Sequence, residues 1–302
     1  MRSTTLRWSS LTGLIAFVTL AGVLAACRSK QAGAPPVATP SVTLGRPRVA
    51  LSSPIDIAYK FIVADNAHFD QDQRVMVHIL DADEELIWTD DHNPPKPTTQ
   101  WKPGETIQYT RTIFVPPCPY IGEATIQIGL YSTVTQKRLP LSGEDMGQRA
   151  YKVAKFQLLP QTENVPIVYK EGWHPVEVGE HSSCASVEWQ WTKKDATLVF
   201  RNPRKDSVLY LETDNPGSVF TENQEVQINL AGQPLDHFTV SPKQQLLMKI
   251  PMTAAQLGTA DMVDLQIDVD KTFVPALLPG SNSKDPRELG IRVFHAFVQP
   301  NP

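Results

Sequence analysis

The stretch that decides the fold is Ile55-Asp-Ile-Ala-Tyr-Lys-Phe-Ile-Val63. Apolar side chains at every second position are typical of a strand with one face in a hydrophobic core, because successive side chains point to opposite faces. The same alternation returns over residues 75–79, 126–130 and 151–159. Short strands separated by turns such as Pro103-Gly104 predict a β-sandwich.

The alternation stops over Pro160–Pro166 (PQTENVP), and a second series of short strands then runs from Ile167 to Val298. One helical turn is expected over Thr253–Leu257, with Thr253 as its cap and Gly258 as its end. Many strands with almost no helix predict a second sandwich and suggest a jelly roll. The sequence therefore predicts an all-β protein with two β-sandwich domains, at residues 49–160 and 161–302.

The first 27 residues have a different character. Arg2 and Arg7 precede an apolar run from Leu11 to Leu24, which is the pattern of a secretory signal. The stretch Leu24-Ala25-Ala26-Cys27 resembles the lipobox of bacterial lipoproteins. That resemblance implies a signal peptide at residues 1–26, acyl chains such as palmitate on Cys27, and attachment to the outward face of a membrane. An ordinary secretion signal followed by a chance cysteine is the alternative.

Residues 27–48 are rich in proline, alanine and glycine, which predicts a flexible tether after the acylated cysteine. In the lipoprotein family an aspartate after the cysteine retains some Gram-negative lipoproteins at the inner membrane. Arg28 stands there instead, which favours the outer membrane where a cell has one. No second long apolar run occurs, so the lipid is expected to be the only membrane anchor.

The charge balance of the mature chain bears on which kind of partner it can bind. Removal of the leader leaves 26 basic and 32 acidic residues, a weakly acidic balance that argues against nucleic acid. Besides Cys27 the chain has Cys118, in a proline-rich turn, and Cys184, in a polar stretch. An exported protein can form a disulfide, and the sequence leaves open whether these two cysteines are bridged.

Motifs of catalysis and metal binding are scarce. A Gly-x-Ser-x-Gly elbow and a zinc-protease helix are both absent from the sequence. The groups His174–His181 and Asp90–Pro95 contain potential metal ligands, but their spacing fits no common zinc or calcium pattern. We therefore predict a polar loop at His174–His181, and no catalytic residue, metal site or cofactor. Paired carboxylates that are brought together from separate loops stay open, because they need only spatial proximity.

The tryptophans give a better indication of function. Trp101 and Trp173 lie in loop-like contexts, where an exposed indole could stack on a sugar, so both are candidate ligand-binding residues. Trp88 and Trp189 lie in predicted strands and are expected to fill the cores. Trp189 and Trp191, two residues apart, should share one face of their strand.

Two looser resemblances concern the mature chain. The first sandwich, with Val75–Asp81, Pro97–Gly104 and Gly129–Pro140, resembles extracytoplasmic β-sandwiches of bacterial membrane proteins for glycan assembly. The second, with Trp189–Thr192 and Lys284–Gly290, resembles domains that accompany glycosyltransferases. These resemblances imply a non-catalytic binding or scaffolding role at the cell envelope, with a polysaccharide or an envelope protein as partner. The alternative is an envelope glycan-processing enzyme. Asp285 and Arg287 are expected to brace their loop by a local ion pair.

Overall fold

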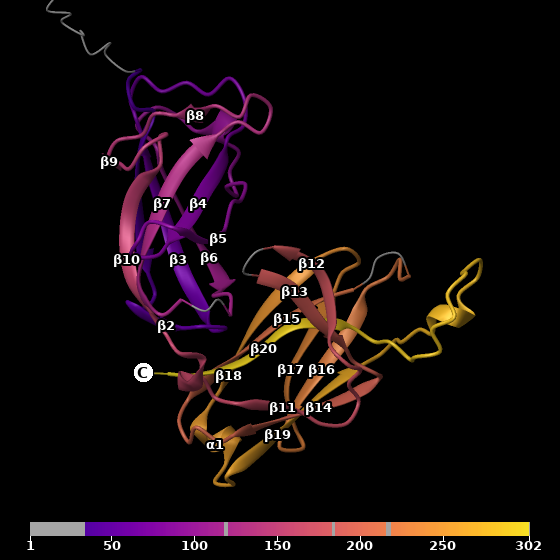
Figure 1. Cartoon of the computed structure of the whole chain (residues 1–302). Helices are drawn as coiled ribbons and strands as arrows, with labels where there is room; N and C mark the ends of the chain where they lie inside the picture. The colour runs from indigo at the N-terminus through magenta and orange to yellow at the C-terminus, as the bar shows by residue number, and fades with distance from the viewer. Residues whose placement is uncertain (1–33, 118–119, 183–184, 216–218, 302) are drawn as a thin grey trace, which may run out of the picture. The chain divides into compact units, whose positions relative to one another are not determined.

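The computed structural model describes residues 34–117, 120–182, 185–215 and 219–301, and almost all regular secondary structure in this part of the chain is β-strand (Figure 1). The expected all-β fold is confirmed. The first ten strands are β1 (Ala38–Leu44), β2 (Arg48–Ala50), β3 (Pro54–Val63), β4 (Arg74–Leu80), β5 (Leu86–Thr89), β6 (Thr106–Phe114), β7 (Gly122–Tyr131), β8 (Arg138–Leu139), β9 (Glu144–Asp145) and β10 (Tyr151–Leu159).

The next ten strands are β11 (Ile167–Tyr169), β12 (Glu177–Ser182), β13 (Ala185–Trp191), β14 (Asp195–Arg201), β15 (Ser207–Asp214), β16 (Gln224–Leu230), β17 (Gln233–Val240), β18 (Gln245–Met252), β19 (Met262–Val269) and β20 (Arg292–Pro300). The helical elements are α1 (Ala254–Leu257), η1 (Thr98–Gln100), η2 (Gln161–Glu163) and η3 (Pro275–Leu277). Among the described residues, no helix has the length and apolar character that crossing a bilayer would require.

Strands β1 to β10 form the first sandwich. One sheet has the order β1-β3-β6, and the other has the order β2-β10-β7-β4-β5, with β8 and β9 at its margin. The alternating side chains of β3, including Tyr59 and Phe61, share one hydrophobic cluster with Ile126 and Ile128 of β7. The chain crosses between the sheets after β1, β2, β3, β5 and β6.

The tether is shorter than the sequence predicted. Residues 38–44, which we expected to belong to a flexible segment, form β1 and pair with β3 over their whole length. The sequence did not predict this strand because it contains Pro40, and a proline has no N–H to donate to a neighbouring strand. A proline is compatible with β1 because β1 is an edge strand, so the missing N–H interrupts no second ladder.

Strands β13 to β20 form a jelly roll, as the sequence suggested. The pairs β13–β20, β14–β19, β15–β18 and β16–β17 are the successive rungs of one long antiparallel hairpin that is rolled into two sheets. Strands β11 and β12 add one edge strand to each sheet. The core between the sheets includes Leu209 and Leu211 of β15 and Leu265 and Ile267 of β19.

Two local expectations have different outcomes. The helical turn is confirmed, since Thr253 and Gln256 form a capping box at the start of α1 and Gly258 ends the helix with a φ of 67°. The polar loop predicted around His174–His181 is wrong in its second half, because Glu177–Ser182 is strand β12. The backbone of this segment pairs with β13 in an antiparallel hairpin, which its polar sequence by itself does not predict.

The predicted domain boundary, residues 160–166, lies where the chain passes from the sheets of the first sandwich to those of the second. Strand β10 ends at Leu159, η2 follows, and β11 begins the second pair of sheets at Ile167. The two sandwiches have separate hydrophobic clusters, although residues 35–302 together make up one compact unit. That each sandwich folds by itself stays a prediction.

We expect fragments 35–160 and 161–302 to melt cooperatively when each is expressed alone, because each retains a complete core. A fragment 48–160 should melt at a lower temperature and aggregate more readily, since it lacks β1 and exposes the edge of β3. Melting followed by circular dichroism tests both expectations. Equal melting of 35–160 and 48–160 would show that β1 adds nothing, and unfolded 35–160 and 161–302 would place the boundary elsewhere.

Candidate functional site

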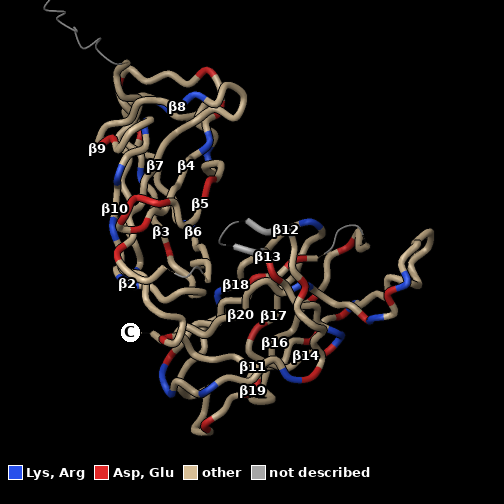
Figure 2. Tube along the Cα trace, viewed as in Figure 1, with Lys and Arg blue, Asp and Glu red and all other residues tan. Residues whose placement is uncertain are grey.

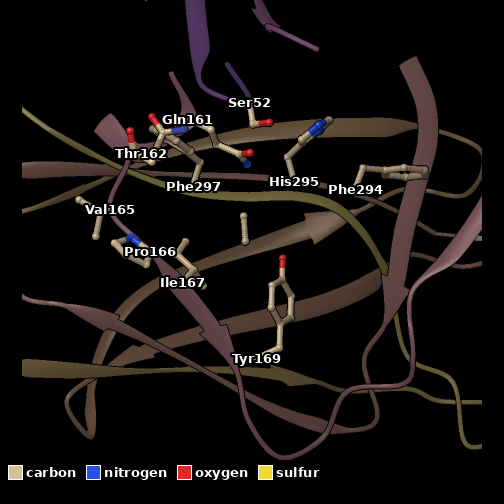
Figure 3. Close-up of a pocket in the computed structure, with 12 residues that line it drawn as sticks. Ser52, Gln161, Thr162, Val165, Pro166, Ile167, Tyr169, Phe294, His295 and Phe297 are labelled. Carbon is tan, nitrogen blue, oxygen red and sulfur yellow. The ribbon is translucent and has the colours of Figure 1, made fainter. Parts of the chain in front are cut away.

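A groove beside β20 is one of the cavities that the described residues line (Figure 3). Its volume is about 580 Å³, within the usual range for small-molecule sites. One wall is the segment from η2 to β11, and the other is β20. The lining residues are Ser52, Gln161, Thr162, Asn164, Val165, Pro166, Ile167, Tyr169, Phe294, His295, Ala296 and Phe297.

A β-bulge in β20 positions two of these side chains. In the register of β15 with β20, Glu212 pairs with His295 and Thr213 pairs with Val293, so Phe294 is the extra residue. In a regular strand, Phe294 and His295 would point to opposite faces. The bulge lets both line the groove, which is the kind of re-aiming that bulges produce near functional sites.

Polar atoms in the groove are available to a ligand. The side chains of Gln161 and Thr162 and the hydroxyls of Ser52 and Tyr169 line it, and none has a hydrogen-bond partner within the described part of the chain. Partial burial raises the pKa of the Tyr169 hydroxyl to about 12, so it stays protonated and can donate. Asn164 instead uses its amide to bind the Leu51 carbonyl, at 2.8 Å.

Trp173, a predicted binding residue, lies behind the groove and does not line it. It is half-buried, its indole N–H donates to the Thr197 carbonyl at 2.9 Å, and its ring packs edge-on against Tyr169 at 4.7 Å between centroids. Gly172 lets the backbone before Trp173 pass close to β14, because a Cβ there would lie 1.8 Å from the Asp195 carbonyl oxygen. Trp173 thus holds Tyr169, while its own contact with a ligand stays a prediction.

Trp101 does not have the exposure we predicted. It is only 5% exposed, it packs against Phe61 and Phe69, and its indole N–H donates to the Lys96 carbonyl at 2.9 Å. The loop that carries Trp101 folds over the core of the first sandwich, so the indole belongs to that core. Nothing in its setting supports the ligand contact we predicted.

Trp189 is more exposed than we predicted. It shares a strand face with Trp191, as expected, but this is the outer face. Neither indole belongs to the core cluster of the second sandwich, although Trp191 is only 8% exposed. Trp189 is half-buried and lies across Gly179, where a Cβ would come within 3.2 Å of the indole. Trp88 is buried, as predicted.

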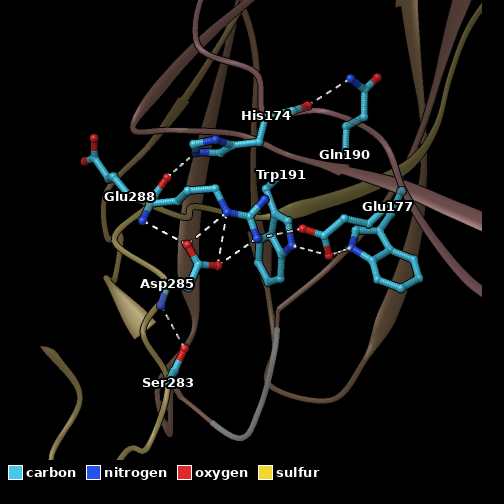
Figure 4. Close-up of polar contacts among 9 residues, drawn as sticks. His174, Glu177, Gln190, Trp191, Ser283, Asp285 and Glu288 are labelled. Atoms are coloured by element: carbon cyan, nitrogen blue, oxygen red, sulfur yellow. Dashed lines mark hydrogen bonds and ion pairs between the residues drawn. The ribbon is translucent and has the colours of Figure 1, made fainter. Parts of the chain in front are cut away.

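Charged side chains brace this outer face, and Figure 4 shows Glu177 and Asp285 among them, beside Trp191. Glu177 accepts from the indole N–H groups of Trp189 and Trp191, at 3.1 and 3.4 Å, and forms an ion pair of 2.8 Å with Arg287. Arg287 also binds Asp285, which confirms the predicted local ion pair, and this bond raises the pKa of Arg287 further. The brace therefore joins the loop before β20 to strand β12.

Arg292 extends the brace to the groove. Its guanidinium binds Asp214 through two hydrogen bonds and lies 5.4 Å from the ring centroid of Trp189 and 5.3 Å from that of Phe294. Such cation–π contacts contribute roughly 0.5–2 kcal/mol each. The contact with Arg292 restrains the ring of Phe294, which is part of the aromatic wall of the groove.

A second cavity of about 400 Å³ shares Ser52, Phe294 and His295 with the groove, and it is lined by charged residues as well. There Asp90 forms a two-bonded ion pair with Arg111, at 2.8 and 3.0 Å. His295 contacts Glu212 at 2.6 Å. These charges are largely engaged with each other.

Two of the side chains considered above as metal ligands have hydrogen-bond partners in the structure. Asp91 accepts from the backbone N–H of Val77 at 2.9 Å, and His174 contacts the Glu288 carbonyl at 2.6 Å. Within the described ranges, no cluster of three His, Cys, Asp or Glu side chains is arranged to hold a metal ion. Cys27, Cys118 and Cys184 lie outside the described residues.

Comparison with known proteins adds little to this picture. No family model matches the sequence, and no curated protein does. Three solved structures that match parts of the chain are a CBM36-1 domain of a xylanase from the hindgut metagenome of Trinervitermes trinervoides, a family 35 carbohydrate-binding module from Clostridium thermocellum, and the C-terminal domain of Wzt.

Their identities to this chain are 8%, 7% and 12%, and their TM-scores are 0.27, 0.27 and 0.30. They cover 46%, 45% and 42% of this chain, and 98%, 99% and 76% of their own lengths. At such TM-scores the matches carry no argument about this protein.

The new positions of the tryptophans give a stability prediction. Trp101→Ala should destabilise the protein by about 3–5 kcal/mol, because it empties a core site. Trp189→Ala should cost less than half as much, because its indole lies outside the core cluster. Denaturant melts of the two variants test this, with Trp88→Ala as the core control. An unchanged melt of Trp101→Ala would contradict its place in the core.

Proposed function

We propose that this chain is a lipid-anchored, non-catalytic binding protein of the cell envelope, and that its ligand is a neutral polysaccharide bound in the groove beside β20. The anchor is Cys27, acylated on the outward face of a membrane, and the outer membrane where there is one. The support for the anchor is the signal pattern and the lipobox-like stretch that ends at Cys27.

The groove lining is the single observation that carries the ligand. Aromatic rings of Tyr169, Phe294 and Phe297 are combined there with hydroxyl and amide groups, several of which have no protein partner in the described chain. A sugar offers C–H faces for the rings and hydroxyls for the polar atoms. The lining has no Lys, Arg, Asp or Glu, so a charged ligand would lose hydration without a countercharge.

A glycan-processing enzyme, the alternative reading of the sequence, needs two carboxyl groups beside the ligand. Asp195 and Asp268 do face each other across β14 and β19, and burial together with Asp195 raises the pKa of Asp268. Neither residue lines any of the described cavities. The absence of carboxylates from the groove lining therefore favours binding over hydrolysis.

A glycan array with the unlipidated chain 28–302, which retains every described strand, tests the ligand. Tyr169→Ala and Thr162→Val should each weaken binding, the former at least about tenfold (about 1.4 kcal/mol), because they remove a stacking face and a hydrogen-bonding group. Phe220→Ala is the matched aromatic control, since Phe220 packs on Phe273 away from the groove.

Binding that survives Tyr169→Ala and Thr162→Val unchanged would place the ligand elsewhere. A chain that binds no glycan but captures an envelope protein would favour scaffolding, and release of shortened sugars from the array would favour an enzyme.

Cys27→Ser should abolish acylation and leave the precursor uncleaved, because the lipid-bearing sulfur is lost. The measurement is the mass of the N-terminal peptide together with partition of the protein between membrane and soluble fractions. Ser29→Ala is the control. A wild-type N-terminal peptide without lipid mass would refute the lipoprotein proposal.

A further inference from the structure

The first sandwich carries a basic pocket that the proposed ligand does not use. Its volume is about 540 Å³, and it lies between the turn that joins β7 to β8 and the turn that joins β9 to β10. The lining residues are Gln136, Lys137, Arg138, Gln148 and Arg149. Every one of these side chains can donate hydrogen bonds, and no carboxylate is among them.

The positive charges of this pocket are not neutralised. Arg138 donates to the Gln148 carbonyl at 3.1 Å, and Arg149 donates to the Arg138 carbonyl. These bonds join the two turns without cancelling charge. Lys137, Arg138 and Arg149 form no ion pair with any described residue. The nearby acids are engaged, since Glu144 pairs with Lys152 at 3.6 Å and Asp145 accepts from the Gly147 N–H at 2.8 Å.

The backbone around the pocket is strained. Eight non-glycine residues of the described chain have positive φ, and three of them, Gln136 (57°), Gln148 (54°) and Arg149 (58°), line this one pocket. Such conformations are unfavourable for residues with a Cβ, and they are concentrated at binding sites where the surroundings hold them. The strain indicates that these donors are positioned in advance of binding.

The pocket lies at the end of the sandwich where the tether enters. The Val37 N–H donates to the Pro140 carbonyl at 2.9 Å, directly after β8, and the Ser142 N–H donates to the Ala38 carbonyl. Nine residues lie between Cys27 and Val37, so the chain spans at most about 35 Å from one to the other. Figure 2 shows basic residues beside β8. Val134, at the tip of the β7–β8 turn, is 82% exposed.

We propose that this pocket binds the phosphate of an anionic phospholipid headgroup in the membrane that holds Cys27, while Val134 enters the interface. This inference rests on the proposed anchor, since the short tether is what brings the pocket to a bilayer. The loop 64–73 at the same end carries Asp65, Asp70 and Asp72. Repulsion from anionic lipid therefore favours contact through the β7–β8 and β9–β10 turns.

Co-sedimentation of the unlipidated chain 28–302 with vesicles tests the proposal independently of the anchor. We expect binding to phosphatidylcholine vesicles that contain phosphatidylglycerol, loss of binding at high salt, and no binding to phosphatidylcholine alone. Lys137→Gln should weaken partitioning about fivefold, and Lys137→Gln with Arg149→Gln should weaken it further. Val134→Asp should weaken it without lowering the melting temperature.

The control is Lys205→Gln with Lys284→Gln, because these lysines are exposed, lie in the second sandwich and form no ion pair among the described residues. Equal partitioning of the pocket variants and this control would overturn the proposal. Binding of inorganic phosphate by calorimetry without vesicle binding would also overturn it, in favour of a soluble phosphate ligand. Loss of lipid mass in Cys27→Ser tests only the anchor, so the two proposals can fail separately.

Discussion

The second sandwich depends on the pairing of β20 between β13 and β15. This last strand buries Val293 and Val298 in the core while its outer side chains line the groove. Its partners in β15 lie far earlier in the chain, so the sheet closes only after nearly the whole domain has been ordered. Such non-local pairing is slow to form, because the entropy of closing a long loop must be overcome first. The groove therefore exists only in the completed fold.

The arginines have a structural role that their charge alone would not suggest. Arg292 is held by Asp214 and by three aromatic rings, and Arg287 is held by Asp285 and Glu177. An exposed ion pair contributes little stability in isolation, but several partners on one guanidinium restrict its motion. The result is an aromatic face on the outside of the sheet that is held by several contacts, next to the groove that Phe294 lines.

The groove and the basic pocket share a physical origin. Regular antiparallel pairing produces alternating side chains on nearly flat faces. The groove forms where a bulge breaks that alternation at Phe294, and the basic pocket forms where turn residues such as Gln148 and Arg149 adopt left-handed conformations. In both places the surrounding sheets hold an irregular backbone, which brings side chains together that a regular strand would keep apart.

Several features were predictable because they depend on neighbouring residues. The alternation in Ile55–Val63 specified a half-buried strand, and the capping residues specified the turn of α1. The two-residue spacing of Asp285 and Arg287 allowed a local ion pair. The polar linker 160–166 marked the change of sheets, although the sequence did not reveal that it forms a wall of the groove. The adjacent aromatic residues Phe294 and His295, which interrupt alternation, were the overlooked signal of the bulge.

The remaining features depend on contacts between distant residues. Loop sequence suggested an exposed Trp101 and strand sequence suggested a buried Trp189, yet the loop closes over the core and the strand turns its tryptophans outward. Strand β1 was hidden because Pro40 is acceptable only at a sheet edge, and the sequence does not say which strand is an edge. The sequence by itself thus determined the all-β class and the strand periodicity, because periodicity is local. Only the tertiary structure decided which face of each strand is buried and which side chains meet, because burial depends on the packing of sheets whose strands are far apart in the chain.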